Sequence, residues 1–221
     1  MKVGHQNMHC EVIALPKREV LSVEDSGPGS LREMIVQAPA GSVIFFDSSL
    51  SGQTIVLSSG HLTINKNLII DASNLANGLT IDGNGNGIVF TTDGDVTLNS
   101  LTITGGSGEI GGGINNSGNL TLLNSTLHDN SAGFGGGAIF NAGELKVVNS
   151  TFYNNRSLGS WGVGGAIYNN AGKLTLVNST IVGNEGKQGG GVFHELGWPW
   201  FISLENTIVA GNTADVGADI Y

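Results

Sequence analysis

The sequence predicts an all-β solenoid, a parallel β-helix with coils of about 25–29 residues, and three observations support this prediction. A block beginning Gly-Gly recurs through the second half of the chain and ends each time on an asparagine, at Asn130, Asn155, Asn184 and Asn212. Successive copies are therefore 25, 29 and 28 residues apart, a period typical of solenoids. Within each copy, apolar residues alternate with polar ones, which indicates strands and excludes helical repeats.

Each coil is expected to contain three short strands, so that equivalent positions in successive coils stack about 4.8 Å apart. One set of these rows should point inward and form a narrow aliphatic core. The predicted inward rows are Ile114/Ile139/Ile167, Leu120/Leu145/Leu174/Ile202 and Leu127/Phe152/Ile181/Val209.

Rows of asparagine are expected at tight corners, where Asn tolerates left-handed backbone and satisfies buried backbone groups. The sequence predicts one buried ladder of side-chain amides at Asn124, Asn149, Asn178 and Asn206. A second row with the same interpretation comprises Asn116, Asn141 and Asn169. Because the first row is expected to be buried, its three Asn-x-Thr sequons are not interpreted as glycosylation sites.

The N-terminal segment, residues 1–40, is organised differently from the coils. Ser30 and Glu33 form a capping box, which predicts an amphipathic helix over residues 30–38. We expect this helix to act as a lid, because the first coil would otherwise expose apolar side chains and unpaired strand edges.

The coils are expected over residues 41–221 as one continuous domain, regular from about residue 96 and preceded by a strand at 20–23. No lid is visible at the opposite end, where residues 217–221 read as the start of another coil. Self-association through that end, or continuation in a longer protein, is therefore expected.

The composition limits the partners of the chain. The formal net charge is −9 and the nine Lys and Arg residues are scattered, whereas nucleic acids and anionic membranes require basic patches. Neither is expected as a partner. No run approaches the roughly 20 apolar residues of a transmembrane helix, and residues 1–20 lack the apolar region of a signal peptide.

Several motifs together point to a known group of proteins. The segment Asp25-Ser26-Gly27-Pro28-Gly29-Ser30-Leu31-Arg32-Glu33, the Gly-Gly-Ala-Ile repeats and Phe152-x-x-Asn155 resemble right-handed parallel β-helix proteins of the pectate-lyase-like superfamily. The similarity covers roughly residues 20–221 and is closest to bacterial surface proteins with an N-terminal "SLREAI" lid and to polymorphic outer-membrane protein repeats. The resemblance implies an extracellular or cell-surface location and a role in adhesion or as a stalk. The superfamily also contains polysaccharide lyases and hydrolases.

Catalysis on such a fold requires clustered side chains that the sequence does not visibly supply. Lyases of this fold need acidic calcium ligands with a basic residue, and glycoside hydrolases need two carboxylates about 5–9.5 Å apart. The regular coils show no such outward cluster, so no catalytic residue is predicted. The best remaining acid–base pair is His194 with Glu195, beside an aromatic loop.

One segment matches the start of a calcium-binding loop. Asp82, Asn84 and Asn86 alternate with glycines, and Asp93 lies at the twelfth position, where a Glu normally completes the site. A plain turn is the favoured interpretation, because runs of Gly and Asn are ordinary corners in this fold and Asp is shorter than Glu. No cofactor is therefore expected, and Ca²⁺ at this loop is the alternative.

The segment Trp198-Pro199-Trp200-Phe201 is inserted where other copies have a tight corner. Its tryptophans either stack on sugar rings or a partner surface, or fold back over the flank of the solenoid. Trp161, in the widened loop 156–163 at a different corner, is a further member of this candidate patch. Trp161, Trp198 and Trp200 are therefore the ligand-binding candidates.

Two other functions have less support in the sequence. An ice-binding face would require a flat outward Thr-x-Thr array, and only Thr102-x-Thr104 has that form. The prediction is thus a non-enzymatic surface or secreted scaffold of the adhesin type, with a polysaccharide or a surface protein as its ligand. A polysaccharide lyase or glycoside hydrolase is the alternative, and an outward acidic cluster with a basic residue would distinguish it.

Overall fold

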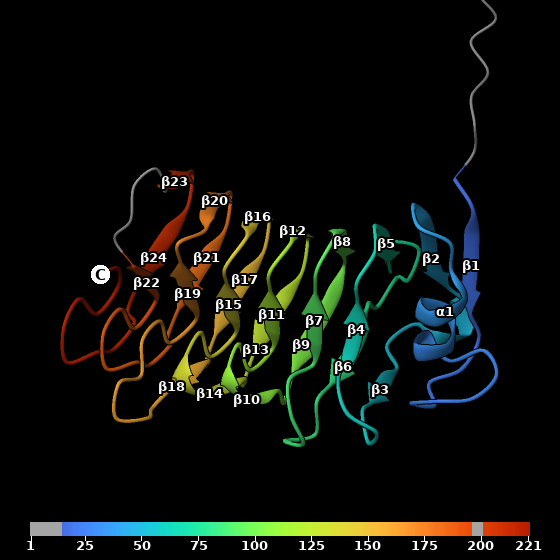
Figure 1. Cartoon of the computed structure of the whole chain (residues 1–221), viewed down its shortest axis with the longest axis horizontal. Helices are drawn as coiled ribbons and strands as arrows, with labels where there is room; N and C mark the ends of the chain where they lie inside the picture. Colours follow the sequence, from blue (N-terminus) through green and yellow to red (C-terminus); the bar gives the residue numbers. More distant parts are fainter. Residues whose placement is uncertain (1–14, 196–200) are drawn as a thin grey trace, which may run out of the picture.

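The sheets of the structure consist of short strands in which inward apolar side chains alternate with outward polar ones. The computed structural model describes residues 15–195 and 201–221, and it is a right-handed parallel β-solenoid of about seven turns with one α-helix near its N-terminal end. The coils follow one another along the long axis of the molecule (Figure 1). The predicted fold class is confirmed.

Three long sheets and one short sheet run along the solenoid, and all their strand pairs are parallel. The eight-stranded sheet contains β1 (Lys17–Val20), β2 (Ser42–Phe46), β5 (Leu68–Asp71), β8 (Asp95–Asn99), β12 (Asn119–Leu123), β16 (Glu144–Val148), β20 (Lys173–Val177) and β23 (Ile202–Glu205). The seven-stranded sheet contains β3 (Thr54–Val56), β6 (Leu79–Asp82), β9 (Leu101–Thr104), β13 (Thr126–His128), β17 (Thr151–Tyr153), β21 (Thr180–Val182) and β24 (Ile208–Ala210). The six-stranded sheet contains β4 (Leu62–Ile64), β7 (Phe90–Thr92), β11 (Ile114–Asn116), β15 (Ile139–Asn141), β19 (Ile167–Asn170) and β22 (Val192–Glu195).

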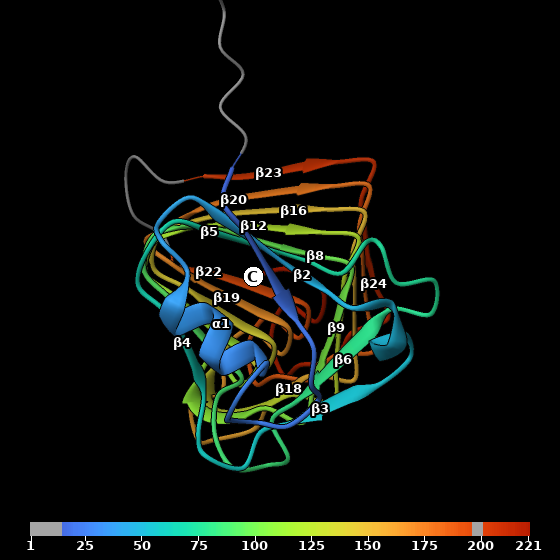
Figure 2. The ribbon, with the colours of Figure 1, turned by 90° about the vertical axis from the view of Figure 1, so that its right-hand side faces the viewer.

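A short strand that the sequence did not predict occurs in three coils, between the seven-stranded and the six-stranded sheets. These strands are β10 (Ser107–Ile110), β14 (Ser131–Gly135) and β18 (Arg156–Ser157), which form a three-stranded sheet. Viewed along the axis, the three long sheets form three sides of the cross-section (Figure 2).

The three predicted inward rows are confirmed. Leu127, Phe152 and Ile181 are in register on adjacent strands and fully buried, and Val209 continues their row in a partly exposed position. The isoleucine row and the leucine row pair in the same way. Each coil therefore buries its apolar side chains against the coil before and the coil after it.

The corner row that begins at Asn124 is exposed, which corrects the prediction of a buried ladder. Asn124, Asn149 and Asn178 adopt left-handed backbone, with φ of 48°, 51° and 50°, as their residue type allows. Their side chains lie outside the coil, where Asn149 Nδ2 donates to Asn124 Oδ1 at 3.2 Å. The argument from burial against reading their sequons as glycosylation sites is therefore wrong.

The serine that follows each corner asparagine occupies the interior instead. Ser125, Ser150 and Ser179 are buried. The backbone N–H of Ser125 donates to Ser150 Oγ at 3.1 Å, and that of Ser150 donates to Ser179 Oγ at 3.3 Å. At this corner Asn therefore adopts the left-handed backbone of the turn, while the Ser hydroxyl accepts a hydrogen bond from a buried backbone N–H group of the preceding coil.

The second predicted ladder is buried, as expected. Asn116 Nδ2 donates to Asn141 Oδ1 at 2.7 Å, and Asn141 Nδ2 donates to Asn169 Oδ1 at 2.6 Å. Thr92 Oγ1 donates to Asn116 Oδ1 at the N-terminal end, and Asn169 Nδ2 lies 2.8 Å from His194 Nδ1 at the other.

A further buried ladder is formed by the asparagines that close the repeats. Asn130, Asn155 and Asn184 each donate from Nδ2 to the Oδ1 of the next coil, at 3.0, 2.9 and 2.9 Å. The row ends where Asn212 Nδ2 donates to Asp219 Oδ1 at 3.0 Å. Buried amides of this kind are stable only because both their donor and their acceptor groups are satisfied.

The predicted lid helix is present as α1 (Leu31–Gln37) with Ser30 as its N-cap. Ser30 Oγ accepts from the backbone N–H of Glu33 at 3.2 Å, while Glu33 Oε2 accepts from that of Gly29 at 2.6 Å. Leu31 and Ile35 are buried, and α1 lies across the N-terminal end of the solenoid (Figure 2).

The strand expected at 20–23 lies earlier, at β1, where it pairs with β2 and extends the eight-stranded sheet. The pairing determines this shift, because it places the side chain of Val20 inside the core. The edge of β2 is thereby covered, as the lid interpretation requires.

Asp25 and Arg32 connect this lid to the loop that follows β3. Arg32 Nη2 lies 2.6 Å from Asp25 Oδ1 and also donates to the carbonyl of Gly60 at 2.6 Å. Asp25 Oδ2 accepts from the backbone N–H groups of Ser58 and Ser59 at 3.0 and 2.7 Å. Burial opposes the charge of the carboxylate, but the hydrogen bonds from Ser59, Arg32 and Ser58 outweigh it and hold the pKa of Asp25 well below its usual range.

At the other end, β23 and β24 are the last strands of their sheets among the described residues. Leu204, which is in register with the buried Leu176, is 44 % exposed there. The predicted self-association through this end stays a prediction. The helices that the structure describes are all too short or too polar to cross a bilayer.

Replacing Phe152 with Ala should lower the free energy of unfolding by about 3–5 kcal/mol, because the fully buried ring leaves a cavity between two coils. Chemical denaturation followed by circular dichroism measures this loss. Thr151→Ala is the matched control, since Thr151 faces outward on the same strand and should cost far less. Equal losses for the two variants would contradict the inward register.

Replacing Asp25 with Asn should destabilise the lid by about 1–3 kcal/mol at pH 7, because a carboxylate accepting several hydrogen bonds is lost. The folded pKa of Asp25 is lowered, so its contribution is present above the unfolded pKa of about 3.9 and is lost as the pH falls below it. The gap in melting temperature between wild type and variant should therefore close in acid. Glu24→Gln, at an exposed carboxylate of the same N-terminal segment, is the control. A gap that stays constant from pH 7 to pH 3 would refute the assignment.

Candidate functional site

The outer face of the six-stranded sheet carries a row of aromatic rings. In each strand of this sheet the residue between two inward side chains points outward, because side chains alternate along a strand. In three successive coils this residue is Phe140, Tyr168 and Phe193, which are in register. Tyr168 contacts the rings of Phe140 and Phe193 edge-on, with centroids 5.2 and 5.5 Å apart.

Further aromatic residues enclose this row. Phe134, from β14, has its ring centroid 6.1 Å from that of Tyr168, and Tyr221 stacks on Phe193 at 5.4 Å. Trp161 is 70 % exposed. Together these side chains define a hollow of about 190 Å³, here called the aromatic hollow, lined by Phe134, Trp161, Val163, Tyr168, Phe193 and Glu195.

A glycine fixes Tyr168 in this position. A Cβ atom on Gly135 would lie 2.5 Å from Cδ1 of the Tyr168 ring and 2.9 Å from Cγ2 of Val163. Because real contacts are not so short, only glycine lets the ring lie against the backbone of β14. The Tyr168 side chain is consequently buried, and only 4 % of the residue is exposed.

The Tyr168 hydroxyl links the rings to a carboxylate. It donates to Glu195 Oε2 on β22 and accepts from Asn170 Nδ2 at 3.0 Å. Burial, and then the Glu195 carboxylate, raise the pKa of Tyr168 above its usual value, since both disfavour the phenolate. Tyr168 is therefore a neutral donor that holds Glu195 at the edge of the aromatic hollow.

His194 and Glu195 do not form an acid–base pair, which corrects the sequence interpretation. As neighbours on a strand they point to opposite faces. His194 is in register with Asn169 and ends the buried amide ladder, whereas Glu195 lies outside beside Tyr168. Of the two candidates, only Glu195 belongs to the aromatic hollow.

The tryptophan candidates have different outcomes. Trp161 lies in the aromatic hollow, as a member of an exposed aromatic patch should. Trp198 and Trp200 lie outside the described residues. Their predicted role in binding stays a prediction.

The four residues of the calcium motif are not brought together. Asp82 ends β6 of the seven-stranded sheet, where its Oδ1 accepts from the backbone N–H of Asn84 at 2.7 Å. Asp93 follows β7 of the six-stranded sheet, which forms a different side of the coil from the sheet that contains Asp82. Asn86 continues the turn through a backbone hydrogen bond to Gly83. Across residues 15–195 and 201–221, no group of three or more His, Cys, Asp or Glu side chains is placed to hold a metal ion.

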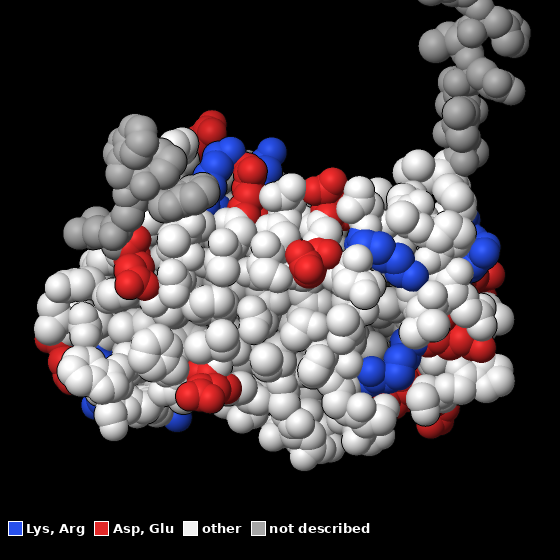
Figure 3. All heavy atoms as spheres, in the orientation of Figure 1, with Lys and Arg blue, Asp and Glu red and all other residues white. Residues whose placement is uncertain are grey.

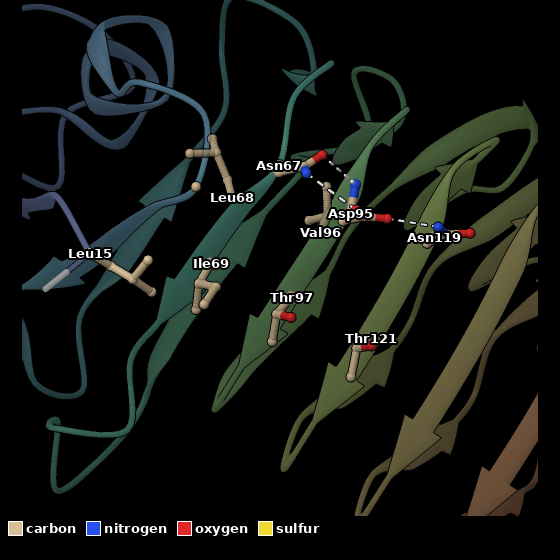
Figure 4. Close-up of a pocket in the computed structure, with 10 residues that line it drawn as sticks. Leu15, Asn67, Leu68, Ile69, Asp95, Val96, Thr97, Asn119 and Thr121 are labelled. Atoms are coloured by element: carbon tan, nitrogen blue, oxygen red, sulfur yellow. Dashed lines mark hydrogen bonds between the residues drawn. The ribbon is translucent and has the colours of Figure 1, made fainter. Parts of the chain in front are cut away.

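A larger hollow, of about 370 Å³, lies on the outer face of the eight-stranded sheet (Figure 4). Three of its polar residues, Asn67, Asp95 and Asn119, are hydrogen-bonded to one another. Asp95 accepts from Asn67 Nδ2 at 3.2 Å and from Asn119 Nδ2 at 2.7 Å, and its own backbone N–H donates to Asn67 Oδ1 at 3.0 Å. These contacts form an outer ladder between coils, so this hollow has less to offer a ligand than the aromatic one.

A row of threonines on the seven-stranded sheet is longer than the sequence suggested. Six threonines are in register along its outer face, namely Thr54, Thr80, Thr102, Thr126, Thr151 and Thr180. The neighbouring outward row contains Asp82, His128 and Tyr153, and the rings of His128 and Tyr153 stack 4.8 Å apart. The flat double array of an ice-binding face is therefore not formed.

Sequence reasoning missed the aromatic row, although a signal for it was present. The motifs Ile139-Phe140-Asn141 and Ile167-Tyr168-Asn169 repeat an aromatic residue between two inward ones, and Phe193 follows Val192 in the next copy. Period-two alternation applied to these motifs places all three rings outside.

Comparison with known proteins agrees with the fold. Residues 68–221 match the family model described as "Right handed beta helix region". No curated protein matches the chain.

The hydrogen bond between Tyr168 and Glu195 can be tested by titration. Because Glu195 raises the pKa of Tyr168, Glu195→Gln should lower the pH at which the Tyr168 phenolate appears. Phenolate absorbance near 295 nm, followed against pH, measures this change, and Tyr168→Phe identifies the component. Asp219→Asn, a carboxylate elsewhere in the last coils, is the control. Identical titrations of wild type and Glu195→Gln would contradict the contact.

Proposed function

The chain belongs to the right-handed β-helix family, and we propose that it is a non-enzymatic scaffold that binds carbohydrate at the aromatic hollow. The observation that carries this proposal is the exposed Trp161 beside a row of ordered rings. Monomeric proteins rarely leave clustered large apolar side chains in water without a ligand or partner for them. Aromatic rings offer flat apolar surfaces, which suit the C–H faces of sugar rings.

The stacked coils support binding to a polymer rather than to a single sugar. Phe140, Tyr168, Phe193 and Tyr221 come from successive coils, so the row of rings runs parallel to the solenoid axis. The buried ladder of Asn141 and Asn169, on the strands that carry the rings, and the close contact of Gly135 with Tyr168 hold this row in place before the ligand arrives. Preorganisation of this kind limits the entropy lost on binding.

The alternative, a lyase or glycoside hydrolase, has less support in the described residues. Glu195 is the one carboxylate among those that line the aromatic hollow, whereas hydrolysis of a glycosidic bond needs two. His128 and Asp129 form a contact of 2.6 Å, but at the seven-stranded sheet and away from the rings. The hollow as described thus resembles a binding surface more than a catalytic one.

We also propose that the scaffold works outside the cell or at its surface as an adhesin-type domain. The resemblance of residues 20–221 to bacterial surface proteins supports this location. An elongated solenoid with ligand contacts on its flank suits a display role, because coils can carry the binding row away from an anchoring point.

Replacing Trp161 with Ala should weaken binding to a recognised polysaccharide by roughly 1–3 kcal/mol, a magnitude borrowed from base–aromatic stacking. The melting temperature should stay unchanged, since the side chain is largely exposed. A glycan array followed by calorimetry measures the affinity. Tyr153→Ala is the matched control, because this aromatic residue lies on the outer face of the seven-stranded sheet. Lost stability with unchanged binding would assign Trp161 to packing and overturn the proposal.

A further inference from the structure

The charge around the aromatic hollow indicates which class of sugar it accepts. We propose, building on the proposed function, that the hollow selects polymers of sugars with a protonated amine, such as deacetylated chitin, over polyuronates. The combination of aromatic faces with one carboxylate carries this inference.

The carboxylate of Glu195 is exposed at the edge of the rings, and the Tyr168 hydroxyl engages only its Oε2 atom in a hydrogen bond. An ammonium group over an aromatic face is attracted by the ring quadrupole, and a carboxylate beside it adds a direct ionic contact. A neutral sugar would gain the stacking alone. A uronate would bring its own carboxylate against that of Glu195.

The nearby basic residues do not cancel the negative charge of Glu195. Arg156 is the first residue of β18, and its Nε lies 3.5 Å from Glu185 Oε2. Lys187 lies between β21 and β22, and its Nζ lies 3.8 Å from Asp215 Oδ2. Each is thus offset by an acidic partner. On the face drawn in Figure 3, acidic and basic residues are scattered among uncharged ones, so no basic patch is available there for a polyanion.

The net charge of the chain acts in the same direction. At −9 it opposes the approach of an anionic polymer over distances up to the Debye length, about 8 Å at physiological salt. The selectivity of the hollow is therefore expected to weaken as salt is added, while the stacking contribution persists.

The test compares three soluble oligosaccharides with one β-1,4-linked backbone: cello-oligosaccharide, its C6-oxidised uronate form, and fully deacetylated chitin oligosaccharide. Binding to the whole chain is measured by calorimetry at pH 6, where the amine is protonated. We expect the amino sugar to bind about three- to tenfold more tightly than the neutral one, and the uronate to bind most weakly. Glu195→Gln should remove most of the preference for the amino sugar, and Glu195→Lys should reverse it.

Two controls separate this inference from the proposed function. Glu205→Gln, on the outer face of β23, changes the net charge equally and should leave the preference in place. Trp161→Ala should weaken all three ligands. If no ligand binds, or if binding ignores Trp161→Ala, the proposed function fails. If binding depends on Trp161 but favours the uronate, or does not respond to Glu195→Gln, the selectivity for amino sugars is wrong and the binding function stands.

Discussion

Parallel hydrogen bonding between successive coils is the constraint on which the rest of this structure depends. Because each strand pairs in register with the same strand one coil later, every residue lies beside its own equivalent. A single position is thus repeated as a row. Such a row is stable only if its residue type is compatible with itself, as branched aliphatic groups, amides and aromatic rings are. The isoleucine rows, the two buried asparagine ladders and the aromatic row are three outcomes of one geometric rule.

Much of this architecture could be predicted from the sequence, since a period of two inside a longer repeat identifies both the strands and their inward faces. The row through Phe152 was predicted in this way and is confirmed. The lid helix was predicted instead from the capping box of Ser30 and Glu33, and it is present over Leu31–Gln37. The orientation of the Asn149 corner was not predicted correctly. Residue type shows that Asn accepts left-handed backbone, but the same preference holds inside and outside the coil, and only the backbone path decides between them. The position of β1 likewise depends on its pairing with β2, a contact between segments distant in the sequence.

The candidate site was predictable only in part, for a related reason. Trp161 was predicted as a binding candidate because it is an aromatic residue in a widened loop. Tyr168 and Phe193 have the sequence pattern of ordinary strand residues and were not predicted. Their importance arises from stacking across coils, which brings together residues that are 25 positions apart. The link between Tyr168 and Glu195 joins residues 27 positions apart, and the space for the Tyr168 ring is provided by Gly135 from yet another strand. Such a site cannot be predicted when each repeat of the sequence is considered separately.

The contacts of the lid also constrain the order in which the chain can complete its structure. Arg32 donates to the carbonyls of Gly60 and His61, and Asp25 accepts from Ser58 and Ser59. These partners lie some thirty residues downstream, beyond the first strands of the coils. On a ribosome, which releases the N-terminus first, the helix emerges before the loop to which it is anchored. The lid can therefore make these contacts only after residues 58–61 have been synthesised, so the N-terminal end of the core is covered after the first strands of the coils are available.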